Sequence, residues 1–160
     1  MNGSIGVIET LKQVKSQPHY QSKKAGLNMG RGVSLGFCRN NSGPASLVAS
    51  VLPDGTISLV EGSIDIGGSR TAIAQIMAEV LGLTARDVIP QVGDTDSIGF
   101  TSVTGGSGVA YKSGWAAHEA ALDIKNQIIK RAAVIWDKDV SEIEYSSGHV
   151  RHASDSELTM

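Results

Sequence analysis

Cysteine is almost absent from this sequence, because Cys38 is the only one among 160 residues. A single cysteine cannot form an internal disulfide, and it offers no ligand set for an iron–sulfur cluster or a structural zinc ion. The four histidines, His19, His118, His149 and His152, are scattered along the chain, so no metal site is predicted. We expect Cys38 to be a partly buried thiol in a reducing compartment.

Long runs of charge or of apolar residues are also missing. Fourteen basic and sixteen acidic residues give a net charge of −2, and the basic residues are adjacent only in pairs such as Lys23 and Lys24. Binding driven by the phosphates of a nucleic acid is therefore not expected. The apolar runs are far shorter than the roughly 20 residues of a membrane span, and the N-terminus does not resemble a secretion signal. We expect a cytoplasmic protein with no membrane partner.

Aromatic residues make up only 4% of the chain and there are four prolines, whereas 41% of the residues are hydrophobic and 19 are glycine. At this length about two-thirds of the unfolded surface can be buried, which is enough for one domain. The glycines are expected in turns, bulges and close backbone approaches rather than in a disordered tail.

Helices are predicted where apolar residues recur at helical spacing. The first covers residues 5–14, a second ends at Gly82, and a long third follows Gly108. The inward face of the second is predicted to carry Ile73, Ile76, Met77, Val80 and Leu81. The inward face of the third is predicted to carry Ala117, Ala120, Ala121, Ile124, Ile128 and Ile135.

Strands are predicted where apolar and small or polar residues alternate. These segments are residues 32–39, 45–52, 56–64 and 88–92, with a final hairpin of residues 143–145 and 149–152. Pro53, Asp54 and Gly55 are typical of a turn that joins two antiparallel strands. The order of elements predicts an α+β fold with an antiparallel or mixed sheet packed against helices. We expect one domain, in which residues 1–29 form an N-terminal helix and connection and residues 30–152 form the main body.

Two glycine-rich loops each precede a predicted helix and could bind an anion. Backbone N–H groups in the first turn of a helix are unpaired, and glycine lets a phosphate or pyrophosphate approach them closely. An alternative is that Ser69 or Ser107 simply caps its helix and that Arg70 is an exposed charge rather than a phosphate ligand. The candidate residues are Gly67, Gly68, Ser69, Arg70, Thr104, Gly105, Gly106 and Ser107.

The other polar residues do not indicate a catalytic or metal-binding site. Asp94 and Asp96 are two residues apart, but aspartates in such loops usually accept hydrogen bonds from their own backbone. Cys38 lies in a β pattern with no identifiable base, so no nucleophilic group is predicted. The residues by themselves thus indicate no more than a phosphate-bearing ligand.

Residues 62–82 resemble a segment of the molybdopterin-binding large subunit of the xanthine dehydrogenase and aldehyde oxidase family. There, a strand similar to Glu-Ile-Gly-Gln-Gly leads into a helix similar to Ala-Gln-Ile-Ala-Ala-Glu-x-Leu-Gly. A β segment, an Asp-Thr-Asp loop and a Thr-Gly-Gly-Ser loop follow, and residues 88–92, 94–96 and 104–107 match them in the same order. Residues 30–37 are similar to the Gly-Arg-Gly-Ile-Ala strand of the family.

The resemblance implies that both glycine-rich loops contact a molybdopterin, in its dinucleotide form, that carries molybdenum in the complete enzyme. It implies an oxidoreductase that hydroxylates a carbon of an aldehyde or heterocycle, a small-molecule substrate. Its partners would be the remainder of the molybdenum subunit and iron–sulfur and flavin subunits or domains. Apolar surfaces that the remainder covers would make the isolated piece self-associate.

The sequence departs from the family at two points. Gly68 stands where the family has glutamine, so a glutamine hydrogen bond to an oxygen ligand of molybdenum cannot be assumed. The glutamate base of the family's Gly-Glu motif has no counterpart, so we expect no catalytic residue and no turnover by this piece alone, which need not retain the cofactor. A stand-alone, non-catalytic binding or interaction module remains an alternative, as does an unrelated phosphate-binding α+β domain.

Overall fold

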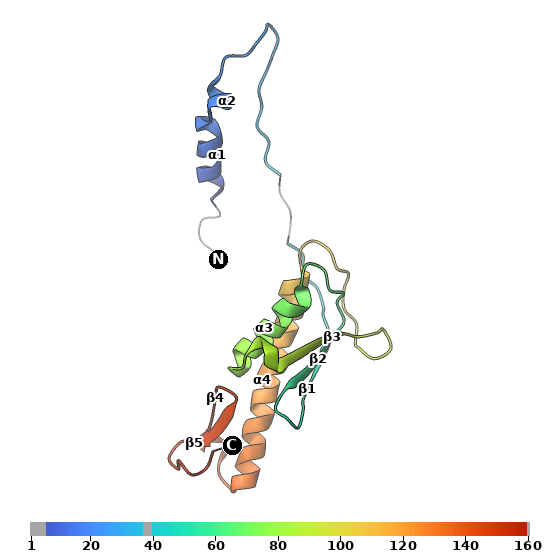
Figure 1. Ribbon diagram of the computed structural model, residues 1–160, viewed down its shortest axis with the longest axis vertical. Coiled ribbons are helices and arrows are strands. Elements are labelled where there is room, and N and C mark those ends of the chain that lie inside the picture. Colours follow the sequence, from blue (N-terminus) through green and yellow to red (C-terminus); the bar gives the residue numbers. More distant parts are fainter. Residues whose placement is uncertain (1–5, 37–39, 160) are drawn as a thin grey trace. The chain divides into compact units, whose positions relative to one another are not determined.

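The N-terminal part of the chain is helical and then extended. The computed structural model describes residues 6–36 and 40–159, which form two compact units divided between residues 37 and 38. The first unit contains helix α1 (Val7–Ser16) and the short helix α2 (Pro18–Gln21) (Figure 1). The predicted N-terminal helix is thereby confirmed two residues further on, although Ile5 lies outside the described residues. The domain boundary expected between residues 29 and 30 stays a prediction.

A three-stranded mixed sheet is the base of the second unit. Its strands, in spatial order, are β1 (Leu47–Val51), β2 (Ile57–Glu61) and β3 (Val88–Val92). β1 runs antiparallel to β2, while β2 and β3 are parallel. The β1–β2 turn forms because Gly55 takes a φ of 84° and Asp54 accepts hydrogen bonds from the backbone and hydroxyl of Thr56. The predicted hairpin is confirmed.

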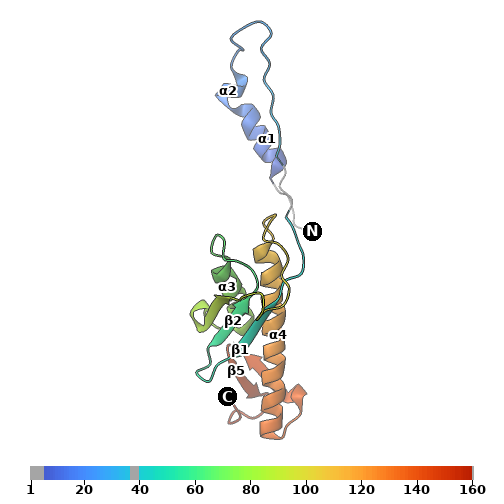
Figure 2. The same cartoon turned by 90° about the vertical axis from the view of Figure 1, so that its right-hand side faces the viewer.

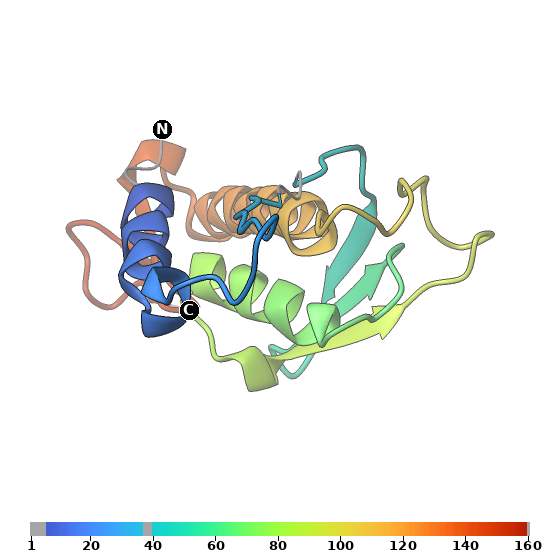
Figure 3. The same ribbon diagram turned by 90° about the horizontal axis from the view of Figure 1, so that it is seen from above.

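Two helices lie side by side on one face of this sheet (Figures 2 and 3). Helix α3 (Ser69–Leu81) and the 3₁₀ turn η1 (Ala85–Asp87) connect β2 to β3, which makes the two strands parallel. Helix α4 (Val109–Trp136) follows the loop after β3. Gly82 ends α3 with a φ of 65°, as predicted.

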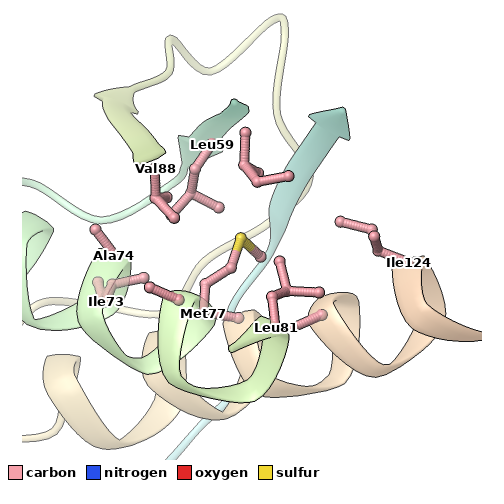
Figure 4. Packing of buried hydrophobic residues seen from close by; sticks show 11 residues of the cluster. Leu59, Ile73, Ala74, Met77, Leu81, Val88 and Ile124 are labelled. Carbon is pink, nitrogen blue, oxygen red and sulfur yellow. The ribbon is translucent and has the colours of Figure 1, made fainter. Parts of the chain in front are cut away.

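The core lies between the helices and the sheet (Figure 4). Leu59 of β2, Ile73 and Met77 of α3 and Ala117 and Ala121 of α4 are all fully buried, with 0% exposure. Small residues on α4 let the two helices approach closely. A fully buried aliphatic side chain contributes about 1.5–3 kcal/mol, so this cluster is the main source of stability.

The C-terminal hairpin packs against the far end of α4. It consists of the 3₁₀ turn η2 (Val140–Glu142), β4 (Ile143–Ser146) and β5 (His149–His152), paired antiparallel. The Tyr145 hydroxyl donates a hydrogen bond of 2.8 Å to the Leu81 carbonyl at the end of α3. The hairpin is therefore tied to both long helices.

Two sequence predictions differ from the structure. Residues 32–36 form no strand, because they make no strand pairing and Val33 and Leu35 stay exposed; residues 37–39, with Cys38, lie outside the described part. Ile135 is 51% exposed, since the last turns of α4 extend past the sheet and bury Ala132 and Ala133 instead, with Trp136 partly buried beside them. Beyond the hairpin, Thr159 forms an antiparallel bridge with Arg151 of β5. The α+β class itself is confirmed.

Candidate cofactor-binding site

The first glycine-rich loop leads from β2 into α3. Gly67 and Gly68 take left-handed φ values of 66° and 77°, and Gly68 is the N-cap of α3 without any side-chain cap. The Ser69 hydroxyl donates to Asp65 Oδ1 at 3.3 Å, so it does not cap the helix as the alternative interpretation predicted. The loop thus places at the surface a helix N-terminus whose N-cap residue, Gly68, supplies no capping side chain.

Asp65 fixes the shape of this loop through hydrogen bonds to Arg70. Its Oδ1 accepts the backbone N–H of Arg70 at 3.1 Å, and its Oδ2 accepts Arg70 Nε at 3.0 Å. The backbone and side-chain hydrogen bonds from Arg70 hold the pKa of Asp65 below its ordinary value. Arg70 therefore already has a partner within the chain, and its side chain is 43% exposed.

The second loop leads into α4 and has the same design. Gly106 and Ser107 take φ values of 57° and 54°, and Gly108 is the N-cap of α4, again without a side-chain cap. Asn41 N–H donates to the Gly106 carbonyl at 2.7 Å, and a Cβ on Gly106 would lie 2.6 Å from Asn41 Cβ. Glycine is required here because the segment before β1 packs directly on the loop.

The structure brings the two loops together. They line one pocket of about 440 Å³. A Cβ added to Gly67, Gly68 or Gly105 would meet no atom within 4 Å, so these three positions face open space rather than the protein. The lining residues are Ile66, Gly67, Gly68, Ser69, Ala72, Thr104, Gly105, Ser107, Gly108, Val109 and Ala110. Gly106 and Arg70, the other two candidates, flank the pocket in sequence but do not line it.

The electrostatics of the pocket favour a negatively charged guest. Neither α3 nor α4 has an acidic residue in its first turn, and both helix N-termini are directed toward the same space. Arg70 and Lys112 instead put basic side chains in these first turns, where the helix dipole disfavours them. At α3 the Asp65 carboxylate offsets this positive field, because it accepts the Arg70 N–H and pairs with the Arg70 side chain. The N-terminus of α4 and the open glycines therefore fit a phosphate-bearing cofactor best.

The sequence profile of the molybdopterin cofactor-binding domain family matches residues 8–160. The chain belongs to this family. The family predicted from the motifs of residues 62–107 is therefore confirmed, and so is the molybdopterin as the cofactor that such a domain binds.

Known proteins similar to this molybdopterin-binding domain include several large subunits. The xanthine dehydrogenase molybdenum-binding subunit of Escherichia coli O157:H7 is 29% identical over 85% of the chain, which spans 19% of that protein. The aldehyde oxidoreductase molybdenum-binding subunit PaoC of the same organism is 28% identical over 81% of the chain and 17% of its own length. The chain thus spans about a fifth of the length of these relatives.

A solved structure shares the fold of the domain. Reconstituted CO dehydrogenase from Oligotropha carboxidovorans superposes with a TM-score of 0.66 and 27% identity. The superposition covers 73% of this chain and 15% of that one. The mixed helix-and-sheet arrangement is accordingly that of molybdenum hydroxylase subunits.

Sequence reasoning missed one buried carboxyl group near this site. Glu61, at the end of β2, is fully buried, and neither of its oxygens has a hydrogen-bond partner in residues 6–36 and 40–159. Burial raises its pKa to about 7, the negative charge of Asp65 adds to this, and Arg70 opposes it. The signal was available, because the alternation of Ile57, Leu59 and Glu61 points all three side chains inward.

The remaining polar candidates behave as structural groups. Asp94 Oδ1 accepts hydrogen bonds from the backbone of Asp96 and Ser97, both at 2.9 Å, which confirms that it caps its own loop. No group of three His, Cys, Asp or Glu side chains could hold a metal ion within the part of the chain that the structure describes. Across the same residues, no helix has the length and apolar character needed to cross a membrane.

Proposed function

We propose that the chain holds part of a molybdopterin through its two glycine-rich loops, residues 67–70 and 104–107. The observation that carries this proposal is the convergence of two glycine-rich helix N-termini on one open pocket. Backbone N–H groups of the first turns donate to the phosphate or pterin oxygens, and Gly67, Gly68 and Gly105 let them come close. Arg70 is paired with Asp65 and does not line the pocket, so it offers no free guanidinium fork to a phosphate.

In the complete protein the domain would belong to an oxidoreductase that hydroxylates a carbon of an aldehyde or heterocycle. The bound molybdenum supplies the two-electron redox chemistry, and this chain contributes binding and orientation of the cofactor. Gly68, in place of a glutamine, presents no side chain toward the cofactor. The family's Gly-Glu base is absent from this sequence, so we expect no turnover by the chain alone.

The exposed apolar residues fit a domain that is covered by other protein. Val48 of β1 and Ile89 of β3 are 51% and 43% exposed on the sheet face that α3 and α4 leave open, and Phe100 in the loop after β3 is 76% exposed. We propose that the remainder of the molybdenum subunit covers this face, with iron–sulfur and flavin subunits or domains completing a cytoplasmic enzyme. Without that cover the chain should self-associate.

Retention of the cofactor by glycine variants tests the loop assignment. Purified chain is mixed with molybdopterin cofactor and desalted, and the retained molybdenum and pterin are measured by mass spectrometry and fluorescence. Gly105→Val should retain far less cofactor than wild type, because the new side chain takes up space that the cofactor needs. A Cβ at this position meets no atom within 4 Å, so the fold should stay intact. Gly32→Val, also at an open position but outside both loops, is the matched control and should behave like wild type. Equal retention by all three proteins would contradict the assignment.

A further inference from the structure

Lys112 is a buried cation with no counter-ion. Its residue is only 6% exposed, although it lies in the first turn of α4. It forms no ion pair with any carboxylate in the described ranges, 6–36 and 40–159. Both burial and the positive end of the helix dipole disfavour an ammonium group at this position.

Three oxygen acceptors compensate for part of this cost. Lys112 Nζ donates to the Ser102 carbonyl, the Ser102 hydroxyl and the Val103 carbonyl, each at 2.7 Å. All three ammonium donors are thereby used, and all three bonds end on the two residues directly before Thr104. Ser102 is also held from the other side, because its N–H donates to the Pro44 carbonyl at 2.9 Å.

These bonds fix the chain directly before the second glycine-rich loop, residues 104–107. We infer that Lys112 is a positioning residue of the cofactor site: it anchors residues 102–103, which sets the course of residues 104–107, and its unneutralised charge favours an anionic phosphate at the start of α4. The inference rests on the proposed binding of the cofactor by residues 104–107. The oxygen acceptors stabilise the ammonium group but do not cancel its charge, so a net positive charge is left to attract the anionic ligand.

A purely structural lysine would behave differently from a charge that favours an anion. Removal of a structural lysine would loosen the loop and lower affinity equally at all salt concentrations. Removal of an attracting charge lowers affinity most at low ionic strength and flattens the dependence of affinity on salt. The slope of affinity against salt concentration therefore separates the two roles.

The experiment uses the 160-residue chain, inorganic pyrophosphate as probe, and the variants Lys112→Met and Lys112→Arg. Lys130→Met is the matched control, because it removes the same charge from an exposed position further along α4. Pyrophosphate is titrated at low and high salt while the amide NMR signals of Gly105, Gly106 and Ser107 are followed. Amide hydrogen exchange of residues 102–108 is measured without ligand.

Lys112→Met should bind pyrophosphate about tenfold or more weakly at low salt, with a flatter salt dependence and faster exchange of residues 102–108. Lys112→Arg keeps the charge and should bind within about threefold of wild type, and Lys130→Met within about twofold. Should Lys112→Met not fold, a folded Lys112→Arg that has lost binding overturns the inference.

The two hypotheses fail in different ways. If wild type binds pyrophosphate at these amides and Lys112→Met binds equally well with unchanged exchange, only the positioning role is overturned. If wild type itself shows no shift at Gly105, Gly106 and Ser107, the proposed use of the loop fails, and the role of Lys112 fails with it.

Discussion

Replacing Glu61 by glutamine should make the protein more stable at neutral and alkaline pH. The carboxyl group is fully buried without a hydrogen-bond partner among the described residues, and burial raises its pKa from the ordinary 4.5 to about 7. The folded state thus binds a proton more tightly than the unfolded state does. Between these two pKa values, the free energy of unfolding must fall as pH rises.

The magnitude follows from this displacement of the pKa. One pH unit corresponds to about 1.36 kcal/mol, so ionised Glu61 lowers the free energy of unfolding by about 3 kcal/mol above pH 7. Below pH 4.5 the group is neutral in both states and the penalty vanishes. Glu61→Gln removes the charge at every pH and keeps the shape of the side chain, so it should exceed wild type by about 2–3 kcal/mol at pH 8 and match it at pH 4.

Urea unfolding followed by circular dichroism at pH 4, 6 and 8 measures the difference between the two proteins. The aspartates with lowered pKa values, such as Asp54 and Asp139, are present in both proteins, so their contributions cancel in the difference. Glu79→Gln, on the exposed side of α3, is the matched control and should differ from wild type by less than about 0.5 kcal/mol throughout. A Glu61→Gln difference that does not change with pH would refute the reasoning.

Three further predictions concern packing and association. Gly82→Ala should destabilise the fold by about 2–3 kcal/mol in urea unfolding, because φ is 65° and the new Cβ would lie 2.7 Å from a backbone carbon of the β4–β5 turn; an unchanged midpoint would contradict this. Tyr145→Phe should cost about 1 kcal/mol by losing the hydrogen bond to the Leu81 carbonyl, and hydrogen exchange in β4 should rise with it. The double variant Val48→Lys, Ile89→Lys should lower self-association in sedimentation velocity, and an unchanged profile would place the contact elsewhere.

Local pattern accounted for most of the secondary structure. The alternation in β1 and β2, the turn at Gly55 and the helical spacing that ends at Gly82 are all decided by neighbouring residues, and each was predicted correctly. Residues 32–36 alternate in the same way but form no strand. A strand requires a paired neighbour, and no local pattern reports whether that neighbour is present.

The sequence by itself determined the family, the α+β class and the two loops. Glycines before helices and an ordered set of motifs depend only on the order of residues along the chain. Only the tertiary structure decided that both loops meet in one pocket, that neither Ser69 nor Ser107 caps its helix, and that Lys112 and Glu61 are buried. The pocket arises because α3 and α4 pack side by side with their N-termini at the same end. Burial depends on which elements cover a side chain, and residues far apart in the sequence provide that cover.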